Sequence, residues 1–180
     1  FNTLYEIVKH SVEKFSSRIA FTMIGGEDVS YKEVGERIEN IQEMLLNAGV
    51  GADDKVAILS SSMPNWGIAY FAITTAGMVA VPILPDFTSS ELELIISHSE
   101  AKAILVSDKL YTKLPKSLVE KMNIVIRTKG LNIISQQVTE RAEKRVPQPD
   151  DLAVIIYTTG TTSKPKGAIL THYNIPAQTT

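Results

Sequence analysis

The residues best suited to chemistry lie in one run of eleven, from Tyr157 to Gly167. The run contains two lysines, two glycines, a proline and five short hydroxyl side chains. The hydroxyl residues are Thr158, Thr159, Thr161, Thr162 and Ser163. Hydroxyl, ammonium and backbone N–H groups all donate hydrogen bonds to anions. Glycine lets a loop fold closely around its ligand. The composition of the run therefore predicts an anion-binding loop.

Short apolar runs flank this polar run on both sides. Leu152–Ile156 precedes it, and Ala168–Leu170 follows it. Short apolar runs that are bounded by turn residues are typical of buried strands. We therefore expect the polar run to be a loop held between two strands of a hydrophobic sheet.

Two common phosphate-binding patterns do not fit the run. In the P-loop pattern G-x-x-x-x-G-K-[ST], the second glycine would stand where this chain has Pro165. The dinucleotide-binding pattern G-x-G-x-x-G needs three glycines, and only Gly160 and Gly167 are present. A Ser/Thr/Gly-rich linker is the plain alternative, although linkers are rarely inserted between two strongly apolar strands.

The run, with the following Ala168–His172, closely resembles the phosphate-loop signature of the adenylate-forming (AMP-binding) superfamily. That superfamily contains acyl-CoA synthetases, peptide-synthetase adenylation domains and luciferases. Two positions depart from its pattern. Thr159 stands where serine is usual and keeps the hydroxyl group, whereas Ser163 stands where glycine is usual. If that position needs a positive φ, Ser163 carries a strain of about 1 kcal/mol or more.

Three other stretches are similar to blocks of the same superfamily, namely Ala76–Ile83, His98–Lys102 and Asp151–Ala153. The resemblance thus covers nearly the whole chain. It implies the N-terminal part of the large domain of such an enzyme, an α/β fold with a mostly parallel sheet flanked by helices. The family's adenine-binding and acyl-binding segments and its C-terminal catalytic lysine lie downstream of the signature. Residues 1–180 are therefore expected to be a single incomplete domain, inactive alone and without catalytic residues of its own.

The resemblance also implies a reaction and its ligands. A carboxylate is joined to the α-phosphate of ATP, pyrophosphate is released, and the acyl group then passes to a thiol. ATP, Mg²⁺ and CoA are the implied cofactors of the intact protein. The resemblance implies that Lys166 contacts a phosphate oxygen. It implies that Thr162 interacts with Mg²⁺ indirectly, by way of the phosphates. Lys164 stands at a position where the family pattern has no fixed residue. The other implied nucleotide-binding residues are Thr158, Thr159, Gly160, Thr161 and Ser163.

A fatty acid is the expected carboxylic-acid substrate, because runs such as Leu170–Ile175 are similar to those of long-chain ligases. An aryl-CoA ligase and a peptide-synthetase adenylation domain are alternatives within the enzymes. A non-catalytic nucleotide-binding module with a vestigial loop is an alternative of another class. The resemblance allows peripheral membrane association of the intact protein.

The composition excludes several classes of function. The 180 residues are 44% hydrophobic and 21% charged, which are the values of a globular protein. A net charge of −2 gives no general attraction to nucleic acid. The chain has no cysteine, so disulfides and thiolate metal sites are excluded, and a reducing, cytoplasmic location is expected. The apolar stretch Gly67–Leu84 is interrupted by polar and turn residues and predicts a helix followed by a strand, not a membrane span.

Hydrophobic periodicity predicts alternating helices and strands, which favours an α/β fold with a largely parallel sheet. Capping boxes at Ser30/Glu33 and Thr88/Glu91 mark two helix starts. Short helical turns are expected around Pro115, and Ile133–Lys144 has weak helical character. The main expected helices are Thr3–Phe15, Tyr31–Asn47, Asn65–Ala76 and Thr88–Ser99; the other expected strands are Ile19–Ile24, Val29–Tyr31, Val56–Leu59, Val79–Ile83, Ala103–Val106 and Ile124–Ile126.

Two further groups have a chemical and a structural interpretation. Ser60–Ser62, at the end of a predicted strand, could form a binding edge, but an ordinary strand-to-helix turn with an N-cap is favoured. Trp66 and Tyr70 lie four residues apart on a helix. For this pair, core packing is favoured over contact with a ligand.

Overall fold

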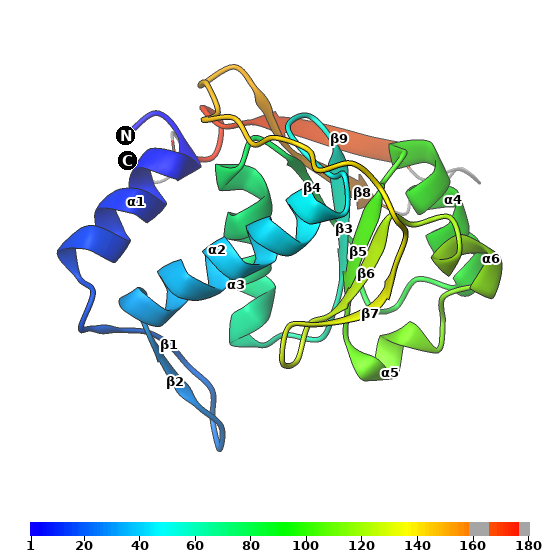
Figure 1. Cartoon of the computed structure of the whole chain (residues 1–180), viewed down its shortest axis with the longest axis horizontal. Coiled ribbons are helices and arrows are strands. Elements are labelled where there is room, and N and C mark those ends of the chain that lie inside the picture. The colour runs from blue at the N-terminus through cyan, green and yellow to red at the C-terminus, as the bar shows by residue number, and fades with distance from the viewer. Residues whose placement is uncertain (159–165, 177–180) are drawn as a thin grey trace.

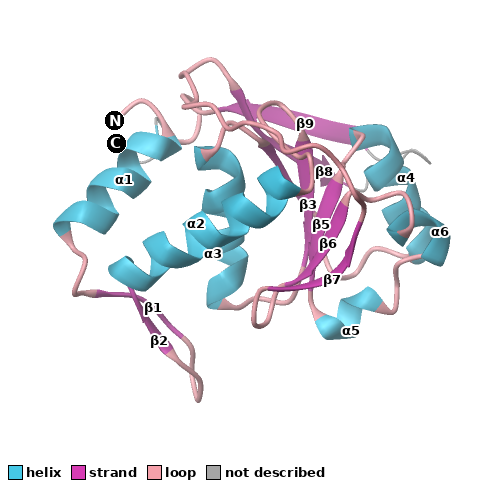
Figure 2. Cartoon of the chain, viewed as in Figure 1, coloured by secondary structure: helices cyan, strands magenta, loops and turns pink. Residues whose placement is uncertain are grey.

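A computed structural model describes residues 1–158 and 166–176 of the chain (Figure 1). The helices are α1 (Leu4–Lys14), α2 (Tyr31–Asn47), α3 (Pro64–Thr75), α4 (Ser89–Ser99), α5 (Asp108–Tyr111) and α6 (Lys116–Val119). The strands are β1 (Ile19–Thr22), β2 (Asp28–Ser30), β3 (Lys55–Leu59), β4 (Val79–Pro82), β5 (Ala103–Val106), β6 (Ile124–Arg127), β7 (Asn132–Gln136), β8 (Leu152–Thr158) and β9 (Lys166–Thr171). From α2 to β6 the helical segments and strands alternate, as the hydrophobic periodicity predicts, whereas in the described residues β6 to β9 follow one another without a helix (Figure 2).

Seven of the described strands form one sheet in the order β7-β6-β5-β3-β4-β8-β9. The five inner strands, β6, β5, β3, β4 and β8, are all parallel to their inner neighbours. The two edge strands pair antiparallel, β7 with β6 and β9 with β8. β1 and β2 form a separate hairpin. The predicted α/β fold with a mostly parallel sheet is therefore confirmed.

The sheet separates two hydrophobic cores. Because side chains alternate along a strand, Val56 and Ile58 of β3 join the core under α2 and α3, whereas Ala57 and Leu59 join the core under α4. Figure 1 shows α1, α2 and α3 on one side of the sheet and α4, α5 and α6 on the other. Parallel strands covered on both faces are apolar throughout, and this explains the uninterrupted apolar runs in the sequence.

Both predicted capping boxes are present. Glu33 N–H donates to the Ser30 hydroxyl and the Glu33 carboxylate accepts from Ser30 N–H, which starts α2. Thr88 and Glu91 make the same pair of hydrogen bonds at the start of α4. In each helix, side chains of the capping box accept hydrogen bonds from two backbone N–H groups at the helix start that have no carbonyl partner within the helix.

The predicted helical character of Ile133–Lys144 is wrong. Its first residues form β7, and the rest belongs to an irregular connection from residue 137 to residue 151, here called the β7–β8 connection. The backbone groups of this connection bond to distant parts of the chain. Ala142 N–H donates to Leu46 O, and Arg145 N–H donates to Ala76 O. Tertiary hydrogen bonds therefore replace the local ones that a helix would make.

Two smaller expectations are also wrong. Ala168–Leu170 was expected to be a buried strand, but β9 is an edge strand and Ile169 is 67% exposed. The expected N-cap after β3 is absent, since Met63 precedes α3 without a side-chain hydrogen bond and Pro64 begins the helix. The Ser60 hydroxyl instead donates to Ser61 O within the turn. Within the described ranges, no helix combines the length and the apolar character needed to cross a membrane.

Candidate functional site

The signature run begins and ends in an antiparallel hairpin formed by β8 and β9. The register runs from Leu152 opposite Thr171 to Thr158 opposite Lys166. Thr158 and Lys166 are both exposed and stand at the closed end of the hairpin. The structure thus brings these two predicted site residues together. The other predicted site residues, Thr159, Gly160, Thr161, Thr162 and Ser163, lie outside the described part of the chain.

The hairpin end is held by Tyr157, which is buried at 3% exposure. Tyr157 is paired with Gly167 across the hairpin. A Cβ on Gly167 would lie 3.4 Å from ring atoms of Tyr157, in ordinary contact, and 3.0 Å from Ile155 Cγ2, which would have to shift by a few tenths of an ångström. Burial raises the pKa of the Tyr157 hydroxyl and keeps it neutral.

Tyr157 also contacts α4. Its Oη atom shares a hydrogen bond of 2.7 Å with Nδ1 of His98, and the two rings meet edge to face with centroids 5.7 Å apart. Sequence reasoning did not assign His98 to the site. The available signal was its position at the start of the family-like stretch His98–Lys102.

The open end of the hairpin is anchored by a network of charges. Arg145 donates to both carboxylate oxygens of Asp53 at 2.8 Å and to Asp151 at 3.3 Å. The hydrogen bonds from Arg145 hold the pKa of Asp53 below its usual range. Asp151 O accepts from His172 N–H. The network connects the start of β8 and the end of β9 to the turn before β3, although its ion pairs are largely exposed and add little stability by themselves.

His172 ends the signature run and is fully buried, and both of its ring nitrogens lack a hydrogen-bond partner within the described ranges. The neighbouring Thr171 caps the turn that follows, because its hydroxyl donates to Asn174 Oδ1 and accepts from Asn174 N–H, while His172 packs inside. A buried imidazole without a partner favours its neutral form.

We expect the stability of the chain to fall as the pH drops below 6.5, because burial lowers the pKa of His172 below that usual value and the charge of Asp151 opposes the shift only in part. Above pH 6.5 the imidazole is neutral in both states, and below it the unfolded chain binds a proton that the folded chain does not. Urea unfolding at about pH 7.5 and about pH 5.5 measures this loss. His172→Leu should flatten the dependence, and an unchanged slope would contradict the assignment.

The donor set suits a polyphosphate. Lys166 supplies an ammonium group and Thr158 a hydroxyl at the same exposed hairpin end, and both are groups that bind phosphate oxygens. In the described residues no three His, Cys, Asp or Glu side chains gather as a metal site. The predicted approach of Thr162 to Mg²⁺ through the phosphates lies outside the described residues.

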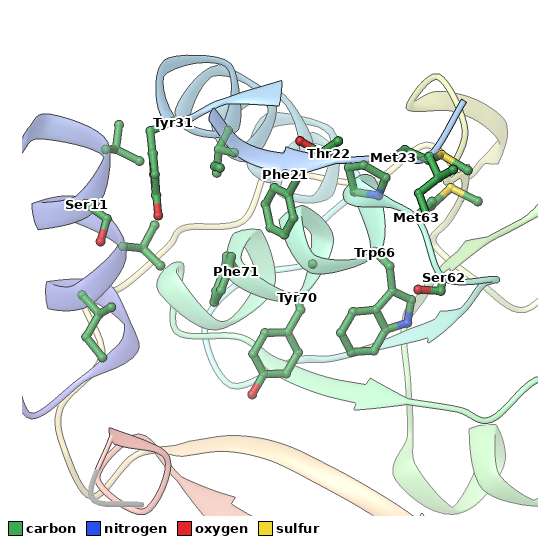
Figure 3. A pocket seen from close by; sticks show the side chains of 18 residues that line it. Ser11, Phe21, Thr22, Met23, Tyr31, Ser62, Met63, Trp66, Tyr70 and Phe71 are labelled. Carbon is green, nitrogen blue, oxygen red and sulfur yellow. The ribbon is translucent and has the colours of Figure 1, made fainter. Parts of the chain in front are cut away.

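Trp66 and Tyr70 line an apolar cavity of about 950 Å³ between α1, the β1–β2 hairpin and α3 (Figure 3). Their rings are nearly parallel, with centroids 5.8 Å apart, and they pack against the core on the α2 and α3 side. Burial raises the pKa of Tyr70 to about 12. Both side chains are half-buried, so they contact the core on one side and the cavity on the other. The cavity lies in the helix layer on the opposite face of the sheet from Tyr157.

Known proteins are similar to this chain over most of its length. Tyrocidine synthase 3 of Brevibacillus parabrevis is 29% identical over 180 residues, which cover 96% of this chain and 3% of that protein. Fatty acyl-CoA synthetase A of Dictyostelium discoideum is 28% identical over 171 residues, which cover 83% of this chain and 26% of that protein. The chain therefore spans only a small part of these relatives.

The fold is also found in solved structures. The anthranilate CoA ligase AuaEII in complex with anthranoyl-AMP superposes with a TM-score of 0.81 at 19% identity, covering 98% of this chain and 35% of that one. A family model described as AMP-binding enzyme matches residues 8–180, which include the whole β8–β9 hairpin. The family match, the signature residues and the hairpin that holds them all indicate the same family. The chain belongs to the AMP-binding enzyme family.

Proposed function

We propose that the chain is the N-terminal part of an ATP-dependent, adenylate-forming acid–thiol ligase. In its first step a carboxylate oxygen bonds to the α-phosphorus of ATP, the bond from that phosphorus to the bridging oxygen breaks, and pyrophosphate leaves. In the second step the thiol loses its proton, its sulfur bonds to the acyl carbon, the bond from that carbon to the phosphate oxygen breaks, and AMP leaves. Negative charge grows on the departing pyrophosphate, and cationic and N–H donors that are already in place stabilise it.

The observation that carries this proposal is the closed end of the β8–β9 hairpin, where Lys166 stands opposite Thr158. Lys166 is exposed, so its ammonium group is available to a phosphate oxygen. The antiparallel pairing fixes the backbone on both sides of the hydroxyl-rich run. A fixed backbone at both ends lowers the entropy cost of binding a ligand between them.

For the acyl substrate we propose a fatty acid, transferred to CoA. The similarity to fatty acyl-CoA synthetase A supports this choice. The similarity to tyrocidine synthase 3 supports the main alternative, in which the chain belongs to a peptide-synthetase adenylation domain and the substrate is an amino acid. The two relatives are almost equally identical to this chain, so the substrate must be decided by direct comparison.

The test is carboxylate-dependent exchange of labelled pyrophosphate into ATP by the intact protein with Mg²⁺. A long-chain fatty acid, anthranilate and a set of amino acids should be compared, and thioester formation should then be measured with CoA. We expect exchange with the fatty acid and none with the 180-residue chain alone. Exchange with amino acids only would transfer the assignment to peptide synthesis, and no exchange with any acid would refute an adenylating enzyme.

A further inference from the structure

We propose that His98 is a positioning residue for Lys166 and acts on it through Tyr157 and the β8–β9 hairpin. The inference rests on the proposed function, because it assigns a role in ATP use to a residue outside the signature run. It does not place His98 in contact with the nucleotide.

The hairpin end pairs with an edge strand. β8 lies beside β4, with Ala80 opposite Val154, and Val154 is four residues before the end of β8. From Ile155 to Thr158, the backbone of β8 is registered with β9, which is itself an edge strand. A side-chain attachment to the body of the protein would therefore add support next to the polar run.

Tyr157 provides that attachment. Its ring packs into the core under α4, and Tyr157 is paired across the hairpin with Gly167, the residue after Lys166. Its hydroxyl meets Nδ1 of His98 at 2.7 Å. Because the two strands are paired there, a displacement of Tyr157 would carry Gly167, and Lys166 with it.

Helix α4 is a firm base for this hydrogen bond. The capping box fixes its first turn. Its inner face, formed by Leu92, Ile95 and Ile96, is completely or almost completely buried. His98 is in the last turn and is itself exposed. Because His98 adds little to the core, substitutions there should spare the fold and change the position of the Tyr157 hydroxyl.

The test compares variants of the intact protein in ATP–pyrophosphate exchange. His98→Phe keeps a ring without the nitrogen, Tyr157→Phe removes the hydroxyl, and His98→Asn keeps a polar atom near the Nδ1 position. We expect His98→Phe and Tyr157→Phe each to lower kcat/KM for ATP about three- to tenfold, the effect of losing one hydrogen bond. The KM for the carboxylic acid should not change, and His98→Asn should restore much of the loss.

Two controls separate positioning from general damage. Ser97→Ala alters an exposed neighbour on α4 and should leave kcat/KM for ATP unchanged. The double variant His98→Phe/Tyr157→Phe should be no worse than either single variant, since both break the same hydrogen bond. Additive losses, an equal rise in the KM for the acid or a full loss in His98→Asn would overturn the proposal.

The inference can fail separately from the proposed function. If the unaltered protein shows no exchange with any acid, the function is wrong, and amide hydrogen exchange of this chain still tests the contact. Faster exchange at Gly167 and Ala168 in His98→Phe than in Ser97→Ala would support the attachment. Equal exchange rates in the two variants would overturn it.

Discussion

Replacing Lys166 with alanine in the intact protein should lower the rate of ATP–pyrophosphate exchange about 10- to 150-fold. The range corresponds to the loss of one charge-assisted contact to a phosphate oxygen, about 1.5–3 kcal/mol. Lys166 is the first residue of β9, exposed and opposite Thr158, so its removal should leave the pairing of the hairpin intact. Unchanged exchange would refute its role in binding the triphosphate.

Two variants control this prediction. Lys164→Ala removes a positive charge from the same run at a position that the family pattern leaves free, and it should retain most of the exchange activity. Lys166→Arg keeps the charge but changes the shape of the donor group, so it should restore only part of the activity. Equal losses in Lys164→Ala and Lys166→Ala would show that net charge, and not one placed contact, supports ATP binding.

Much of the fold could be predicted because local signals and tertiary packing agree. The capping boxes at Ser30 and Thr88 define helix starts by hydrogen bonds within four residues. The fully buried parallel strands need apolar residues on both faces, so β3 and β5 appear in the sequence as uninterrupted apolar runs. The two strands around the polar run could also be predicted, since apolar runs enclose it, but their antiparallel pairing was not.

The remaining features depend on distant contacts that leave no local pattern. The segment after Gln136 has some helical spacing, but its backbone bonds to Leu46 and Ala76. Ala168–Leu170 has the composition of a buried strand, yet its position at the sheet edge exposes Ile169. The hydrogen bond between His98 and Tyr157 joins residues 59 positions apart. Propensity cannot identify such a pair, because either residue would be acceptable in its element without the other.

The second large effect should come from Gly77→Ala, which we expect to reduce the free energy of unfolding by about 2–5 kcal/mol. Gly77 has φ of +77°, and this conformation costs a residue with a Cβ about 1–2 kcal/mol. The added Cβ would also lie 2.7 Å from the carbonyl oxygen of Arg145. Forcing the two backbones apart adds the cost of overpacking, about 1–3 kcal/mol.

The consequence of that clash extends to the hairpin. Arg145 N–H bonds Ala76 O, and the Arg145 side chain holds Asp53 and Asp151. Displacing the β7–β8 connection from Gly77 should therefore loosen the start of β8 as well as destabilise the whole chain. Urea unfolding gives the loss of stability, and hydrogen exchange of the amides from Ala153 to Ile155 reports the loosening.

Gly25→Ala is the matched control for this prediction. Gly25 has φ of +70°, close to that of Gly77, but no atom beyond its own and those of its two chain neighbours lies within 4 Å of the Cβ that alanine would add. Gly25→Ala should therefore cost only about 1–2 kcal/mol, the conformational part of the penalty. The difference between the two variants measures how closely the β7–β8 connection approaches Gly77. Equal costs would mean that the connection yields freely, and that its hydrogen bonds and ion pairs, not close packing, hold the start of β8 in place.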